Sequence, residues 1–160
     1  MAEDVTRVMM DEHQLILRMI TLVEKNTALL EQRRFRNWQF YLDAVDFIRN
    51  YADRFHHAKE EDVLFVELIK NGMPEKNSPI EAMLMEHDQG RGHVRGMEEA
   101  AQKALEGETG QAPAIIEHAR AGVVRDPETA RQLASFWDPA AHGCAPGPTD
   151  PEPQKEDVDP

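Results

Sequence analysis

Residues 55–65 contain two histidine–glutamate pairs at the i, i+4 spacing that puts both side chains on one helical face. The pairs are His56 with Glu60 and His57 with Glu61. Because the pairs are offset by one residue, an α-helix can turn only one of them inward. The face of the first pair is otherwise apolar and carries Ile48, Ala52 and Val63. We therefore predict that His56 and Glu60 point into the interior, with His57 and Glu61 at its edge or outside.

Two further histidines lie on apolar helical faces. His13 shares its face with Met9, Ile16 and Ile20. His87 shares its face with Ile80, Met83, Leu84 and Val94. A histidine and a glutamate one turn apart can bind the same metal ion, and the carboxylate can bridge to a second one. The sequence therefore predicts a metal site made of His13, His56, Glu60 and His87.

Each of these residues alone also fits an ordinary structural role, such as a core histidine bonded to the backbone or a half-exposed glutamate. Their occurrence on three separate helices favours one shared site over independent accidents. Whether His57 or Glu61 contributes stays open. We expect His93 at the rim, and we do not expect His118 or His142 to be ligands.

Composition narrows the class of protein. The 160 residues suit a single domain, and the net charge of −12 would repel a phosphate backbone, so nucleic acid is not expected as a partner. Cys144 is the only cysteine, which excludes an internal disulfide and thiolate clusters. With no long apolar run and an acidic start that lacks a secretory pattern, we expect a soluble, cytoplasmic protein that does not bind membranes.

The periodicity of apolar residues predicts four helices, from about 4 to 33, 38 to 70, 79 to 106, and from 113 onward. Asn37 is the predicted cap of the second helix. In the third, Ser78 is the predicted cap, with Glu81 reaching back to its amide. Short connections force neighbouring helices to run antiparallel, so the expected fold is all-α, an up-down-up-down four-helix bundle.

The C-terminal part is less regular. Gly122 and Pro127 are expected to interrupt the fourth helix, with a short helix at 128–137 carrying apolar side chains to the core. The bundle should thus occupy residues 1–137. Residues 138–160 are rich in proline and acids, which predicts a disordered tail.

Three strings resemble the first three motif segments of the hemerythrin-like, or HHE cation-binding, family. They are Asp11-Glu12-His13, the run FHHAKEEDVLF at 55–65, and Glu86-His87-Asp88-Gln89-Gly90-Arg91. The family fold is a four-helix bundle around a non-haem di-iron centre, and its members bind or sense oxygen, sense iron, or handle nitric oxide and peroxide. The resemblance covers about residues 5–105 and implies that His13, His56, Glu60 and His87 are iron ligands.

The chain departs from the family in the fourth helix, where a second pattern of His, three residues and Glu is usual. Residues 122–137 contain no histidine. Asp126, Glu128 or a partner chain could supply the missing ligands, or the chain could leave its ancestral reading frame near Gly122. We expect iron-dependent binding or sensing of oxygen, another small diatomic ligand or iron itself. The alternatives are an enzyme acting on peroxide or nitric oxide, and a metal-poor interaction module.

Overall fold

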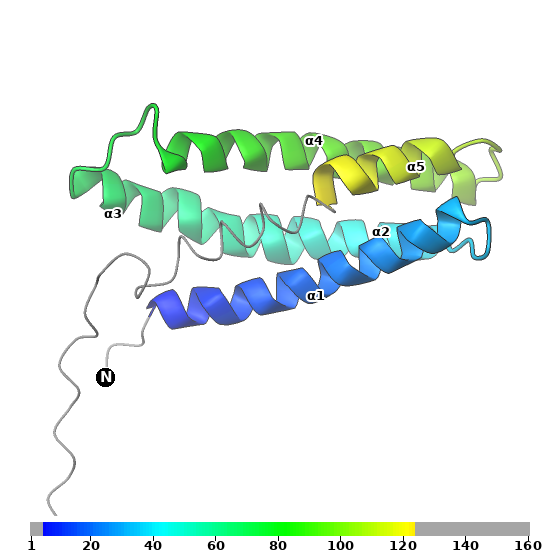
Figure 1. Ribbon diagram of the computed structural model, residues 1–160, viewed down its shortest axis with the longest axis horizontal. Helices are drawn as coiled ribbons and strands as arrows, with labels where there is room; N and C mark the ends of the chain where they lie inside the picture. Colours follow the sequence, from blue (N-terminus) through cyan, green and yellow to red (C-terminus); the bar gives the residue numbers. More distant parts are fainter. Residues whose placement is uncertain (1–4, 124–160) are drawn as a thin grey trace, which may run out of the picture.

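The computed structural model describes residues 5–123, which form four helical segments running in alternating directions (Figure 1). The first is α1 (Val5–Glu31). The second is one continuous helix made of α2 (Trp38–Phe47), the π-helical stretches η1 (Ile48–His57) and η2 (Glu60–Leu64), and α3 (Phe65–Lys70). The third is α4 (Pro79–Leu105), and the fourth is α5 (Ala112–His118) followed by π-helical η3 (Ala119–Val123). Between residues 5 and 123 there is no strand, so the predicted all-α four-helix bundle is confirmed.

Local capping explains where the long helices begin. The side chain of Asn37 accepts a hydrogen bond from the backbone N–H three residues on, at 3.1 Å, as predicted. The hydroxyl of Ser78 accepts from the N–H of Glu81 at 3.5 Å. The Glu81 carboxylate accepts in turn from the N–H of Asn77 at 2.6 Å, one residue before the predicted amide. Gly72, at φ 97°, ends the second segment in the left-handed conformation that glycine allows.

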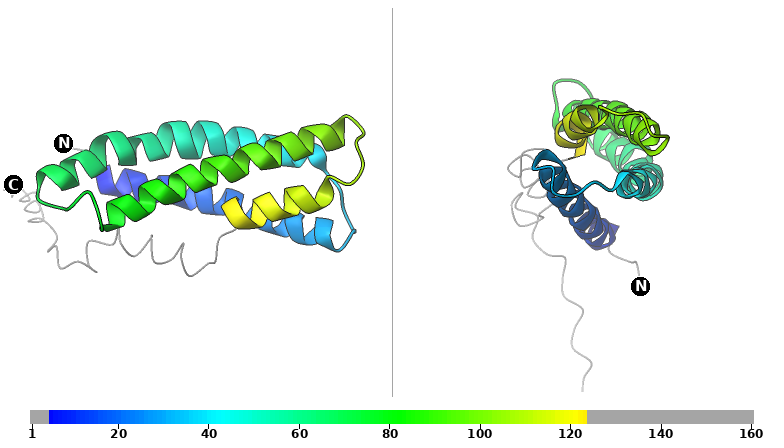
Figure 2. Two further views of the ribbon diagram at one scale, coloured as in Figure 1. Left: turned by 90° about the horizontal axis from the view of Figure 1, so that it is seen from above. Right: turned by 90° about the vertical axis from the view of Figure 1, so that its right-hand side faces the viewer.

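The hydrophobic core consists of two separate clusters. The larger cluster joins all four segments and includes Val23, Leu30, Tyr41, Val45, Val94, Met97, Ala101, Ile115 and Ala119. The smaller one, beside the α3–α4 loop, consists of Phe65, Ile80 and Met83. Figure 2 shows that α5 and η3 run along only part of the bundle. A Cβ atom at Gly90 of α4 would lie 4.0 Å from the carbonyl oxygen of Gly122, so residue 87, about one turn earlier in α4, lies near the end of the described fourth segment.

A close approach between α4 and the fourth segment depends on two glycines. A Cβ atom at Gly96 would lie 2.3 Å from Nε2 of His118, and one at Gly122 would lie 2.1 Å from Cβ of His93. Real Cβ contacts are never this short, so each glycine makes room for a histidine of the facing helix. The Nδ1 atoms of the two histidines meet at 3.2 Å.

The prediction that Gly122 interrupts the fourth helix is wrong. The helix continues through Gly122 to Val123, because the missing side chain at this position lets η3 pack against α4. Other predictions fall outside the described residues: Pro127, the short helix at 128–137, the tail at 138–160, Asp126, Glu128 and His142. None of the helices from residue 5 to residue 123 has the length and apolar content of a membrane span.

Candidate metal centre

Three ligand atoms from two helices form a compact triangle. Nε2 of His56 lies 3.1 Å from Nε2 of His13 and 3.3 Å from Oε1 of Glu60, and Nε2 of His13 lies 3.7 Å from the same oxygen. Transition metals bind such atoms at short distances; for zinc these are about 2.0–2.1 Å, and an ion at that distance fits between three atoms spaced in this way. His56 and Glu60 are buried, with 0% and 3% of their surface exposed, as the apolar face predicted.

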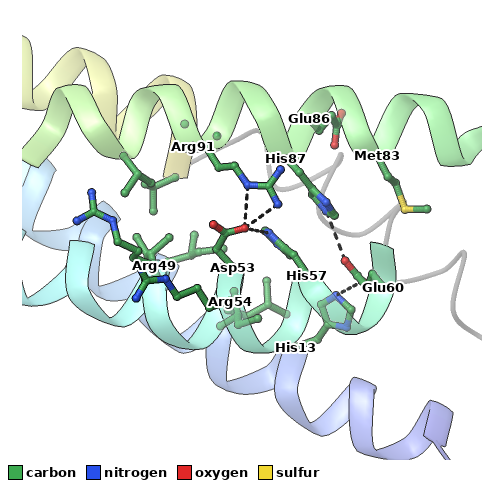
Figure 3. Close-up of a pocket in the computed structure, with 18 of the residues that line it drawn as sticks. His13, Arg49, Asp53, Arg54, His57, Glu60, Met83, Glu86, His87 and Arg91 are labelled. Carbon is green, nitrogen blue, oxygen red and sulfur yellow. Dashed lines mark hydrogen bonds and ion pairs between the residues drawn. The ribbon is translucent and has the colours of Figure 1, made fainter. Parts of the chain in front are cut away.

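The other oxygen of Glu60 faces a second group of ligand atoms. Oε2 lies 3.4 Å from Nε2 of His87 on α4 (Figure 3). A ring nitrogen of His57 completes this group, in which the three ligand atoms all lie within 4.8 Å of one another. Glu60 therefore stands between two sets of imidazoles, His13 with His56 and His57 with His87. The structure brings together all four residues expected from the sequence and adds His57.

The π-helical backbone explains why two adjacent histidines reach the same centre. The N–H of Ala58 donates to the carbonyl of Asp53, five residues back, where an α-helix would bond four back. The wider turn rotates consecutive side chains by less than the about 100° of an α-helix. His56 is buried, while the side chain of His57 is 26% exposed, so His57 lies at the edge as expected and still faces Glu60. Such stretches are often found at functional sites.

Carboxylates contact the ring nitrogens of His56 and His87 that point away from Glu60. Oε2 of Glu12 lies 2.8 Å from Nδ1 of His56, and Oε1 of Glu61 lies 2.7 Å from Nδ1 of His87. Lys59 forms an ion pair with the other oxygen of Glu12. A carboxylate behind a metal-binding histidine fixes the orientation of its ring and raises its basicity.

Arg91 connects two of the supporting carboxylates. Its Nη2 lies 2.8 Å from Oδ1 of Asp53 and 2.7 Å from Oε1 of Glu61. The same oxygen of Asp53 lies 3.5 Å from Nδ1 of His57, and Figure 3 shows Arg91, Asp53 and His57 in a row. Arg91 thus holds the carboxylates that face both His57 and His87. The sequence predicted His57 and Glu61 at the edge of the interior or outside it and left their contribution open, and it indicated no role in the site for Glu12 or Asp53.

Electrostatics favour an ionised Glu60. Burial raises the pKa of Glu60, but the hydrogen bond with His56 and the nearby histidines outweigh burial and lower it. Burial lowers the pKa of His56, yet its two carboxylate neighbours, Glu60 and Glu12, hold it above the usual value. Burial lowers the pKa of His13. Burial, followed by the charge of His87, lowers the pKa of His57 to about 4, which leaves a neutral ring able to donate a lone pair at neutral pH.

A cavity of about 590 Å³ opens beside the two groups. Its lining combines His13, His57, Glu60 and His87 with apolar side chains of α1 and α4, and includes Met10, Ile16, Leu17, Met83 and Val94. It extends along the bundle to Gly122 and Val123, where the described chain ends. His13, His57, Glu60 and His87 therefore face this cavity, whereas His56 does not line it.

The donor set and the fold together point to a cation-binding bundle, and a comparison with protein families agrees. Residues 4–135 match the family model described as the hemerythrin HHE cation binding domain. The chain belongs to the hemerythrin family. Comparisons with curated proteins and with solved structures gave no match. The matched range of this hemerythrin-family chain extends beyond the resemblance seen in the sequence, which ended near residue 105, and it covers the fourth helical segment.

Proposed function

We propose that this hemerythrin-family chain binds non-haem iron and uses it to bind or sense oxygen, another small diatomic ligand or iron itself. The carrying observation is the environment of Glu60. It is a buried carboxylate whose ion-pair partners, within residues 5–123, are the imidazoles of His13, His56 and His87, with no lysine or arginine among them. Without a metal ion, only protonated histidines of the described segments compensate this buried anion, whereas as neutral rings they form with it a good donor set for a cation.

The choice of iron rests on the family, since nitrogen and oxygen ligands also suit zinc and manganese. Iron, when bound, would supply a redox-active centre. The residues of this chain would hold it: the histidines and Glu60 as ligands, and Glu12, Glu61 and Asp53 as partners that fix the rings. The cavity beside them gives a small ligand a route to the centre.

The proposed partner is therefore a small diatomic molecule such as O2, and neither a nucleic acid nor a membrane. The proposed location is the cytoplasm, in keeping with a chain that has one cysteine and cannot form an internal disulfide. A binding or sensing protein takes up its ligand reversibly. An enzyme at the same centre would consume peroxide or nitric oxide over repeated turnovers.

The test is to strip the purified chain with a chelator, load it anaerobically with ferrous salt, and measure iron content and the optical spectrum with and without air. We expect bound iron and a spectral change in air that reduction reverses. Glu60→Gln keeps the shape but removes the charge, so it should lose iron, while the matched variant His118→Gln, at a histidine outside both groups, should keep it. A native chain that takes up no iron would overturn the proposal, and steady consumption of peroxide or nitric oxide would replace binding with catalysis.

A further inference from the structure

The group formed by His57, Glu60 and His87 offers a replacement for the histidine ligand that the fourth helix lacks. Residues 112–123 contribute no atom to either group, although the fourth segment does contain a histidine, His118. The ring of His118 packs over Gly96 and against His93 instead. Within the described residues, an imidazole for a second metal ion must therefore come from another segment.

We infer that His57 supplies the imidazole that the fourth helix lacks, so that a second cation binds to His57, His87 and Oε2 of Glu60. This inference rests on the proposed iron function and concerns which residues hold the second ion. Glu60 would then bridge, with Oε1 on the ion of His13 and His56 and Oε2 on the second ion.

Three observations carry the assignment. First, the π-helical turn brings His57 to the side of Glu60, whereas an α-helical turn would direct the His57 side chain away from the face of His56 and Glu60. Second, Nδ1 of His57 is buried yet has no hydrogen bond, its nearest carboxylate oxygen being 3.5 Å away on Asp53. Third, Asp53 is itself held by Arg91, so the residue behind His57 has the same fixed placement as Glu61 behind His87. A ring nitrogen with a nearby fixed carboxylate is the arrangement found behind metal-binding histidines.

The rings of His57 and His87 are stacked, with centroids 3.8 Å apart and planes 8° apart. Two ligands of one ion direct their lone pairs toward a common point, so one ring must turn when the ion binds. Rotation about the last torsion of histidine is soft. The 26% exposed side chain of His57 has more room to turn than that of His87, which is 11% exposed. We therefore expect His57 to be the ring that turns.

The inference is tested by iron stoichiometry in the full chain. The native chain and His57→Gln are stripped, loaded anaerobically with ferrous salt, desalted and analysed for iron and protein. We expect about two ions per native chain and about one in His57→Gln. His93→Gln is the matched control, because it removes a part-buried histidine outside both groups, and it should keep both ions.

The outcomes separate this inference from the proposed function. A native chain without iron contradicts both. A native chain with one ion contradicts the second site, and with it the role of His57, but leaves the proposed function standing. A His57→Gln chain that keeps two ions contradicts only the role of His57 and means that the ligand comes from residues 124–160 or from a second copy. If His57→Gln fails to fold by far-UV circular dichroism, Asp53→Asn replaces it. That variant keeps the ring and removes the charge behind it, so one of the two iron-binding phases should weaken by about 10- to 100-fold, and two unchanged phases contradict the role of His57.

Discussion

Alanine substitutions at two glycines of α4 test the close approach between α4 and the fourth segment. Gly92 faces open space, whereas Gly96 faces the ring of His118. Replacing a helix-interior glycine by alanine favours the helix by about 0.8–1 kcal/mol. At Gly92 nothing lies within 4 Å of the added Cβ. We therefore expect Gly92→Ala to raise the free energy of unfolding by up to about 1 kcal/mol.

At Gly96 the same added atom meets the ring of His118, with contacts of 2.3, 2.5 and 2.6 Å to three ring atoms. Overpacking of a well-filled site costs about 1–3 kcal/mol, which outweighs the gain in helix propensity. We expect Gly96→Ala to lower the free energy of unfolding by up to about 2 kcal/mol. The same substitution, four residues apart in one helix, should thus have opposite effects.

Urea unfolding followed by far-UV circular dichroism measures both variants, and equal slopes allow the midpoints to be compared. Introducing His118→Ala into the native chain and into Gly96→Ala completes a double-mutant cycle, in which removing the ring should abolish most of the cost at residue 96. If Gly96→Ala proves as stable as Gly92→Ala, or if its cost persists without the ring of His118, the described contact is wrong.

Three further predictions follow from other contacts. Asn37→Ala removes the cap that accepts the hydrogen bond at 3.1 Å and should cost about 1 kcal/mol in urea unfolding; an unchanged midpoint would show that the cap contributes nothing. Arg91→Met releases Asp53 and Glu61 and should weaken iron binding at the His57–His87 group by about 10- to 100-fold in an anaerobic titration. Arg95→Met, which removes another arginine that lines the same cavity, should leave the affinity unchanged. Equal effects of the two substitutions would argue against the role of Arg91. The hydrogen bond with Arg49 lowers the pKa of Glu98 below 4.5, so this contact stabilises the fold above pH 4.5 and the stabilisation is lost as the pH falls through the lower folded pKa. Because the Glu98 side chain is 38% exposed, Arg49→Met should reduce the acid dependence of the unfolding free energy by no more than about 1 kcal/mol. A larger change would mean that the pair is not screened by solvent.

The features that the sequence predicted correctly depend on neighbours in the chain. The caps at Asn37 and Ser78 act over three residues, and the apolar faces of the long helices follow from spacing alone. Burial of His56 and Glu60 could be predicted in the same way, because both lie on one apolar stripe.

The features that were missed depend on contacts between segments or on an unusual backbone. Glu12 is 6% exposed and contacts His56, 44 residues away, and nothing in its own neighbourhood distinguishes it from Asp11. Whether His57 faces Glu60 stayed open in the sequence, because the α-helical turn used for the prediction differs from the π-helical stretch observed. The fourth segment needs a glycine at residue 122 because His93 of α4 packs against that position. His93 lies 29 residues earlier in the chain, so spacing along the sequence does not indicate this contact.

The position of Glu60 has a consequence for how the centre would fill. Its two oxygens belong to one delocalised carboxylate, one near His13 and His56 and the other near His87. A first ion would draw electron density from the oxygen left for a second and would also hold that oxygen still. The two binding events are then thermodynamically linked, and the linkage is reciprocal. Iron-binding curves should depart from the sum of two independent hyperbolas. A substitution that disturbs one of the two sites should also change the iron affinity of the other.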